Sequence, residues 1–309
     1  MKIIFMGTPD FSVDTLKALI DAGHEIVLAV TQPDRPKGRG KSVQGSPVKE
    51  AALAHGIKVY QPRRVREPES VEYLKTFHAD IIVVVAFGQI LPEEILEMPP
   101  YGCINVHASL LPKYRGAAPI QWAVINGEKV SGVTTMRMDE GLDTGDIILR
   151  EEVVLEEKET GGSLFDKLSA TGARLCVRTL AAIEDGTAVY TPQDHAQATK
   201  VGLISKKFGL IDWNMPAVKI ECLIRGLNPW PSAYTKLNGK TYKIWDADVC
   251  NGNTEKAPGT VTSVKKDAIL VQTGDGVLVL REVQLEGKKR MPCGDFLRGY
   301  AVDEGMRFS

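Results

Sequence analysis

The most constraining feature of this 309-residue sequence is its longest apolar run, from Ile81 to Phe87. The segment Ile81–Ala86 is apolar at every position and rich in β-branched residues. A strand without a polar position has both faces buried, which is typical of the centre of a parallel sheet that helices cover. The run is less than half of the ~20 residues that span a bilayer. It therefore predicts an internal strand and not a membrane helix.

Around this run, short β-rich segments alternate with helical patterns. Lys2–Met6, Glu25–Val30 and Cys103–His107 are predicted strands, and helical periodicity separates them. The alternation ends in a long helical pattern at Ser163–Glu184. Strands that alternate with helices favour a doubly wound, Rossmann-like α/β domain, which we assign to residues 1–190.

The rest of the chain has a different pattern. A polar, mixed stretch over residues 191–207 predicts a linker. Beyond it, residues 208–309 contain one helical pattern and five short β-rich runs, with turn signals at Asn238-Gly239 and Gly274–Gly276. These features predict a smaller C-terminal domain with an OB-like β-barrel. A chain of this length exceeds the usual span of one hydrophobic core, which agrees with two domains.

Charge is distributed unevenly along the chain. The formal net charge is −1, yet from Lys206 onward 16 Lys and Arg stand against 12 Asp and Glu. A second basic segment lies in the first domain, in a loop with the cations Arg35, Lys37, Arg39 and Lys41. Such clusters indicate an anionic partner such as nucleic acid, although a solvated basic loop remains an equal alternative.

The five cysteines exclude two other classes of protein. They are odd in number, far apart in sequence and without a CxxC pair, which fits neither a disulfide framework nor a zinc site. We therefore expect reduced thiols in a cytoplasmic protein without a bound metal. The N-terminal apolar residues also form too short a run for a signal peptide.

Two polar clusters are candidates for chemistry. Asn105 and His107 lie two residues apart in a predicted strand, so their side chains share one face near its C-terminal end, where open α/β sheets bind ligands. A glycine-punctuated acidic loop contains Asp143. From the spacing alone, both clusters remain open to a structural interpretation. The GxGxxG, P-loop and GxSxG motifs are absent, which disfavours dinucleotide binding, P-loop chemistry and serine hydrolysis.

Taken together, several motifs carry a resemblance to a known family. The sequence contains GTPDF, TQPDRP, INVHASLLP, RGAAPIQ, GLDTGD and, near the C-terminus, NPWP. In these motifs it resembles the folate-dependent formyltransferases, and the basic loop and C-terminal barrel narrow the likeness to those that act on methionyl-tRNA. The likeness extends over essentially the whole chain.

The resemblance implies transfer of a formyl group from 10-formyltetrahydrofolate to the amino group of initiator methionyl-tRNA, in support of translation initiation. It implies that the catalytic residues are Asn105, His107 and Asp143. It implies that the folate site is formed by Ser109, Leu110, Leu111 and Pro112, together with Phe87, Gly88 and Leu91. It further implies that the tRNA acceptor end meets Arg35, Lys37, Arg39 and Lys41, and that the barrel contacts tRNA phosphates.

Two other functions remain as alternatives. A formyltransferase that acts on a sugar amine or a ribonucleotide amine would share Asn105, His107 and Asp143 but would need no basic barrel. A noncatalytic RNA-binding protein with a decayed α/β domain is the second alternative, and retention of the complete residue trio argues against it. We expect the protein to act as a monomer.

Overall fold

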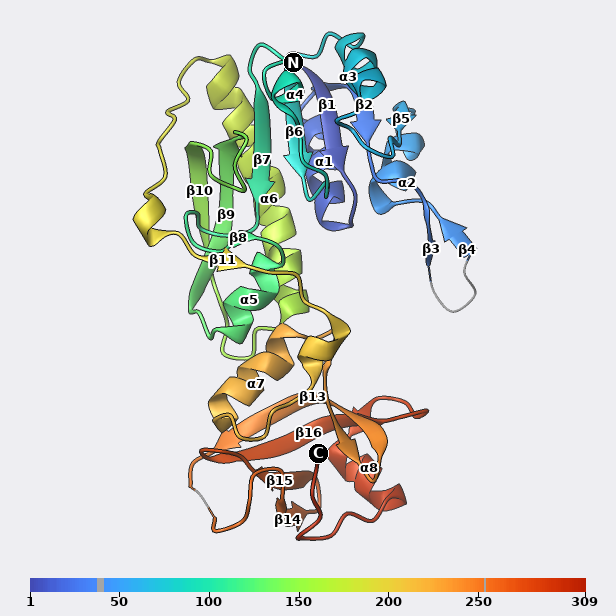
Figure 1. Cartoon of the computed structure of the whole chain (residues 1–309), viewed down its shortest axis with the longest axis vertical. Helices are drawn as coiled ribbons and strands as arrows, with labels where there is room; N and C mark the ends of the chain where they lie inside the picture. The colour runs from blue at the N-terminus through green and yellow to red at the C-terminus, as the bar shows by residue number, and fades with distance from the viewer. Residues whose placement is uncertain (38–41, 253) are drawn as a thin grey trace. The chain divides into compact units, whose positions relative to one another are not determined.

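The computed structural model describes residues 1–37, 42–252 and 254–309, and Figure 1 shows the chain. Contacts within the chain divide it into two compact units. The first unit comprises Met1–Gly116, Val130–Val154 and Phe165–Val201. The second comprises Ala117–Lys129, Leu155–Leu164 and Gly202–Ser309. The chain therefore crosses between the units several times.

The first unit is built on a seven-stranded mixed sheet (Figure 1). Its strands, in spatial order, are β10 (Ile147–Val154), β9 (Val130–Arg137), β7 (Cys103–His107), β6 (Ile81–Val85), β1 (Lys2–Gly7), β2 (Glu25–Val30) and β5 (Val59–Tyr60). The five strands from β7 to β5 pair in parallel. Strand β9 is antiparallel to both β7 and β10. The sheet is therefore parallel at its centre and antiparallel at one edge.

The expectation for the apolar run is confirmed. Strand β6 pairs in parallel with β1 and β7, and all five of its residues are buried. On one face, Ile82 and Val84 pack with residues of α3 (Pro68–Lys75) and α4 (Glu93–Leu96). A strand that is buried on both faces needs helices on both sides of the sheet. Other helices cover the opposite face of this sheet.

That opposite face is covered by α1 (Phe11–Asp21) and α6 (Gly161–Glu184). The two helices meet where the rings of Phe11 and Phe165 lie 5.4 Å apart. Gly172 of α6 lies against Val106 and Val133 of β7 and β9, and a Cβ on this glycine would come within 3.1 Å of Val106. A small residue at this position lets the helix approach the sheet closely.

The second unit contains an antiparallel sheet whose strands match the five predicted β-rich runs. Its order is β12 (Ala233–Leu237), β13 (Lys240–Cys250), β16 (Val277–Leu285), β15 (Ala268–Gln272) and β14 (Val261–Lys265), and β17 (Met291–Pro292) also pairs with β16. Two helices, α7 (Ala217–Gly226) and α8 (Cys293–Gly299), pack on it. Helix α8 was not expected from the sequence.

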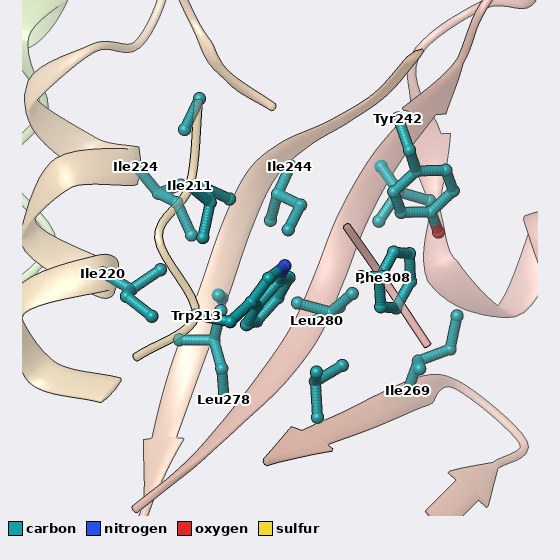
Figure 2. Packing of buried hydrophobic residues seen from close by; sticks show 14 of the residues in the cluster. Ile211, Trp213, Ile220, Ile224, Tyr242, Ile244, Ile269, Leu278, Leu280 and Phe308 are labelled. Carbon is teal, nitrogen blue, oxygen red and sulfur yellow. The ribbon is translucent and has the colours of Figure 1, made fainter. Parts of the chain in front are cut away.

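Buried aliphatic side chains and a few aromatic rings form the core of the second unit, as Figure 2 shows. Tyr242 and Phe308 lie 5.3 Å apart, and Phe308 stacks on Trp213 with ring centroids 5.6 Å apart. Leu280 of β16 and Ile220 of α7 complete this part of the cluster (Figure 2). Since Phe308 is the penultimate residue of the chain, the C-terminus is an integral part of this core.

The C-terminal segment also links the two edges of the antiparallel sheet. Ser309 exchanges two backbone hydrogen bonds with Lys236 of β12, and Phe308 donates one to Gly259, just before β14. The pairing path itself ends at β12 and β14. Closure into an OB-like barrel therefore stays a prediction, and what the structure shows is an antiparallel sheet with its edges bridged.

The predicted basic loop is partly a hairpin. Strands β3 (Arg35–Lys37) and β4 (Ser42–Gln44) pair antiparallel and extend away from the sheet, past α2 (Pro47–Ala54) (Figure 1). At the base of this hairpin, Lys49 of α2 forms an ion pair of 2.5 Å with Asp34. Helix α2 begins after Ser46, whose hydroxyl accepts a hydrogen bond from the Lys49 backbone.

Among the described residues, no helix is long and apolar enough to cross a membrane. All five cysteines are described, and each is a free thiol. Four of them are buried, and only Cys250 is exposed.

Candidate active site

The C-terminal end of β7 presents Asn105 and His107 on the same face, because they lie two positions apart on the strand. The His107 ring is buried, with 7% of the residue exposed, and Asn105 is partly buried. The chain turns directly after the strand, where the Ser109 backbone donates a hydrogen bond of 2.9 Å to the His107 carbonyl. The two side chains are therefore fixed at the edge where β7 ends.

Asp143 joins them from the loop between β9 and β10. The Asn105 amide nitrogen lies 3.4 Å from Asp143 Oδ1, and His107 Nδ1 lies 3.8 Å from the same oxygen. The other carboxylate oxygen accepts a hydrogen bond of 2.8 Å from the Gly116 backbone. One oxygen of Asp143 is thus anchored by a hydrogen bond. The other oxygen faces Asn105 and His107 at distances longer than a strong hydrogen bond, so it is available to bond a substrate or a water molecule.

The orientation of His107 is set by its other nitrogen. Nε2 lies 2.9 Å from the backbone carbonyl oxygen of Tyr114. A carbonyl oxygen only accepts hydrogen bonds, so Nε2 must carry a proton. Nδ1 is therefore the nitrogen that faces Asp143 and is available for proton chemistry. Tyr114, which presents this carbonyl, has a backbone φ of 60°.

Two buried polar residues near Asp143 were not identified from the sequence. Arg115 donates two hydrogen bonds to the side-chain oxygen of Gln193, at 3.1 and 2.7 Å. Gln193 in turn donates to the backbone carbonyls of Asp143 and Gly145, at 3.0 and 2.7 Å. Gln193 falls in the stretch predicted to be a linker, and no sequence pattern connects it to a loop 50 residues earlier.

The segment predicted to bind folate lies directly after the site, but most of its side chains point inward. Ser109 and Leu111 are almost fully buried. The Thr134 hydroxyl donates to the Ser109 carbonyl at 2.7 Å and accepts from the Leu111 backbone at 3.1 Å. Leu110 packs against Gly132, and the Leu111-Pro112 peptide is cis. A folate-binding role for this segment stays a prediction.

The second predicted folate segment follows β6. Phe87 and Leu91 are buried in the core of the first unit, and Gly88 adopts a φ of 82°. The Phe87 carbonyl accepts hydrogen bonds from Thr8 at 3.1 Å and from Gln32 at 3.2 Å, which fixes this turn. The folate role of these three residues is likewise untested.

Two large apolar side chains are left exposed, one in the second predicted folate segment and one beside Asp143. Ile90, in the turn after β6, is 78% exposed, and Leu142, beside Asp143, is 60% exposed. Burying such side chains against an apolar ring would remove this surface from water, which is favourable. Both side chains therefore offer apolar surface to a ligand.

Of the four cations predicted to meet tRNA, Arg35 and Lys37 lie on β3. Arg39 and Lys41 lie outside the described residues. The structure thus places two of these residues in one strand of the β3–β4 hairpin.

The described residues near this site offer no candidate for a cysteine nucleophile or for a metal-binding group. Burial raises the pKa of the Cys103 thiol, at the start of β7, and of the Cys176 thiol to about 12. Thiols of this kind remain protonated at neutral pH and are poor nucleophiles. Within the described parts of the chain, no group of three or more His, Cys, Asp or Glu residues is arranged to hold a metal ion.

A separate cavity of about 640 Å³ lies between α1, α2 and α6 in the first unit. It is lined by Asp14, Lys17, Glu50 and His55 among others, and by none of the three candidate catalytic residues. Its mixed charges are those of a solvated groove between helices, and we assign it no role.

The chain is similar to known proteins over its whole length. Residues 1–180 match the formyl transferase family, and residues 203–301 match the formyl transferase C-terminal domain. The methionyl-tRNA formyltransferase of Agathobacter rectalis is 66% identical over 309 residues, which covers 100% of both chains. The protein of the same name from Lachnospira eligens is 58% identical over 311 residues, which covers 99% of both chains.

A solved structure supports the fold. The N-formyltransferase from Helicobacter canadensis, in complex with folinic acid and dTDP-3-aminofucose, superposes with a TM-score of 0.67. It is 19% identical to this chain, and the match covers 91% of this chain and 98% of the other. At this identity the likeness concerns the fold alone.

Proposed function

The chain belongs to the formyl transferase family, and on that basis we propose that it transfers the formyl group of 10-formyltetrahydrofolate to the amino group of initiator methionyl-tRNA. The observation that carries the proposal is the convergence of Asn105, His107 and Asp143 at the end of β7. We assign the reaction to a Rossmann-like catalytic domain and the binding of tRNA to an OB-like C-terminal domain. The proposed enzyme is a cytoplasmic monomer.

Asn105 and His107 would stabilise the transition state. When the amine attacks the formyl carbon, negative charge develops on the formyl oxygen. The Asn105 amide nitrogen and, when the imidazole carries a proton on both nitrogens, His107 Nδ1 are suited to donate hydrogen bonds to that oxygen. A well-placed donor of this kind contributes ~3–4 kcal/mol. The Tyr114 carbonyl holds the His107 ring so that Nδ1 remains directed at the site.

Asp143 would accept the proton that the amine loses. An α-amino group titrates near ~8, so a neutral fraction is present before attack and no strong base is needed. After attack, the nitrogen is positively charged and its proton can pass to Asp143 Oδ1, directly or through water. The bond between the formyl carbon and N10 of the folate then breaks, and N10 leaves with a proton. Oδ1 is suited to this role because the Gly116 hydrogen bond anchors the other oxygen and keeps the carboxylate oriented.

10-Formyltetrahydrofolate would supply the formyl group as a substrate. The exposed side chains of Ile90 and Leu142 would cover its apolar ring system. The segments Ser109–Pro112 and Phe87–Leu91 would then form the walls through their backbones, since Phe87, Ser109 and Leu111 are buried. The chain would hold the donor by packing and backbone polar groups and would form no covalent bond to it.

A cationic surface on the second unit supports tRNA as the carrier of the amine. It consists of Lys236, Lys240, Lys243, Lys288, Lys289 and Arg290 on the paired strands β12 and β13 and in the loop after β16, and it contains two carboxylates, Glu282 and Glu286. Lys243 and Arg290 lie over the Trp245 ring, at 5.4 and 4.7 Å from its centroid. Gln284 accepts a hydrogen bond from Trp245 and donates one to the Lys288 carbonyl, which ties the loop to the sheet.

The same surface holds the whole positive excess of this part of the chain. Hydrogen bonds from Thr241, and to a smaller extent Lys240 and Lys236, lower the pKa of Glu286, so this carboxylate lies among the cations. Glu282 pairs with Arg290. Six cations and two carboxylates give the surface a charge of +4, while the other ten Lys and Arg from Lys206 onward are matched by ten Asp and Glu. Phosphates would therefore be attracted chiefly to this surface.

A paired substitution tests this surface. Lys288 and Lys289 are exposed, so their joint replacement by alanine removes two charges without disturbing the core. We expect weaker binding of initiator tRNA and a plot of log affinity against log salt that is less steep by about 1 to 2. Filter binding at several salt concentrations measures both quantities.

The chain offers a matched control for this experiment. Lys265 and Lys266 are also consecutive, exposed and at the end of a strand of the same sheet, but they lie outside the cationic surface. The variant with both replaced by alanine should keep the wild-type salt dependence. If wild-type protein binds no tRNA, or binds it with no salt dependence, a formyltransferase for a sugar amine or a ribonucleotide amine becomes the better proposal.

The basic loop gives a separate prediction. Arg39→Ala should lower kcat/KM for methionyl-tRNA while leaving the KM for the formyl donor unchanged, because we assign this loop to the acceptor end of tRNA. Steady-state kinetics with each substrate varied in turn measures the two effects. Normal kinetics with tRNA in the variant would refute the role of the loop.

A further inference from the structure

We propose that Arg115 and Gln193 form a brace that positions Asp143 for formyl transfer. The activity part of this inference rests on the proposed function. The two residues are 3% and 6% exposed, so neither is placed to touch a substrate. They are positioning residues, and their effect passes through Asp143.

The brace begins with a buried guanidinium whose described hydrogen bonds go to Gln193 and His195 and to no carboxylate. Arg115 donates from Nε and one terminal nitrogen to the side-chain oxygen of Gln193, and its other terminal nitrogen lies 3.2 Å from His195 Nδ1. Burial of a charged group is costly unless its hydrogen bonds are satisfied. Arg115 is therefore kept in place by its hydrogen bonds to the segment that contains Gln193 and His195.

Gln193 passes this restraint to the catalytic loop. Its amide nitrogen donates to the carbonyls of Asp143 and Gly145, at 3.0 and 2.7 Å. The orientation of the amide is unambiguous, because Arg115 can only donate and the two carbonyls can only accept. Glutamine is the side chain that meets both demands at once, since it carries an acceptor and two donors.

The loop needs such a restraint because of its backbone conformation. Asp143 has a φ of 54°, in the left-handed region that is unfavourable for a residue other than glycine. The brace also reaches the carboxylate of Asp143 through Gly116, which follows Arg115 on strand β8 (Arg115–Gly116) and donates to Oδ2. Strand β8 is held in turn by parallel pairing with β11 (Lys200–Val201). The backbone of Asp143 is thus held by Gln193, and its carboxylate is held by Gly116, the neighbour of Arg115.

The substitution Gln193→Glu removes the hydrogen bonds that position Asp143 and keeps the size of the side chain. Glutamate has the same shape and still accepts from Arg115, but it has no N–H group for the carbonyls of Asp143 and Gly145. We expect kcat to fall ~10- to 100-fold, as for a catalytic group displaced by about 1 Å. The KM for the formyl donor should stay close to wild type, whereas the thermal midpoint should fall, because two buried carbonyls lose their donor. Gln197→Glu is the matched control, because Gln197 is exposed in the same segment and bonds only Asp194 among the contacts described.

Two further measurements decide whether the effect passes through Asp143. In an Asp143→Ala background, Gln193→Glu should lower single-turnover formyl transfer no further, whereas a merely structural role would lower it by the same factor as in wild type. Hydrogen exchange of the backbone amides in residues 139–146 should be faster in Gln193→Glu and unchanged in Gln197→Glu.

The possible outcomes distinguish failure of the brace from failure of the proposed function. Unchanged kcat, additive losses in the double variant or unchanged exchange in the loop would each overturn the brace. Absence of formyl transfer in wild-type protein would overturn the proposed function instead. In that case the exchange measurement still decides whether Gln193 restrains the loop.

Discussion

His107→Ala is expected to lower kcat for formyl transfer by ~10²- to 10³-fold, which is the usual effect of removing one donor to a developing oxyanion. The substitution removes Nδ1, which faces Asp143 at 3.8 Å, and leaves Asn105 as the remaining donor. Affinity for tRNA should stay nearly unchanged, because we assign tRNA binding to the cationic surface and the basic loop.

The measurement is a kinetic one with a binding control. Single-turnover rates give the loss in the chemical step, and filter binding gives the affinity for tRNA. His55→Ala is a suitable control, because His55 is exposed at the end of α2 and its ring contacts only the Ala51 carbonyl among the hydrogen bonds described. Equal losses of rate and affinity in His107→Ala would mean that His107 binds tRNA and does not act on the formyl group.

Gly145→Ala is expected to have the second large effect, because the backbone leaves no room for a methyl group there. A Cβ on Gly145 would lie 1.7 Å from the Arg137 carbonyl oxygen and 3.4 Å from the Asp139 nitrogen. The ends of β9 and β10 would have to separate, since the Arg137 backbone also donates to the Asp146 carbonyl at 2.9 Å. The loop between them carries Asp143, so the carboxylate would move with it.

We expect Gly145→Ala to lower kcat by ~10²-fold or more through misplacement of Asp143. The free energy of unfolding should fall by ~1–3 kcal/mol, the usual cost of overpacking. Steady-state kinetics and thermal unfolding measure the two changes. Gly202→Ala is the control, since no atom lies within 4 Å of its Cβ position. A Gly145→Ala variant with wild-type kcat would show that the loop does not need this close approach.

Much of the fold could be predicted from local patterns. Strand β6 was expected from an apolar run without a polar position, and its five residues are buried between β1 and β7. The five strands of the second unit were expected from turn residues between short β-rich runs. Helix α8 was missed because it has only seven residues, too few to show helical periodicity. The hairpin of β3 and β4 was missed because Pro36 argues against a strand.

Less of the candidate active site than of the fold could be predicted from the sequence. The period of a strand places Asn105 beside His107, but it does not bring Asp143 to them. That residue was identified only through the resemblance, because the position of its loop depends on contacts far apart in sequence. Gln193 shows the limit most clearly, since a polar stretch gives no sign of the hydrogen bonds that it makes to Asp143 and Gly145.

The most direct test of the proposed reaction is formyl transfer from labelled 10-formyltetrahydrofolate by the purified chain. Initiator methionyl-tRNA and elongator methionyl-tRNA are compared as acceptors, with Asp143→Ala as the inactive reference. Our account predicts that the label appears on the methionyl amino group of the initiator and is much reduced in the Asp143 variant. Absence of label on methionyl-tRNA, together with formylation of an amino sugar nucleotide or a ribonucleotide amine, would contradict it.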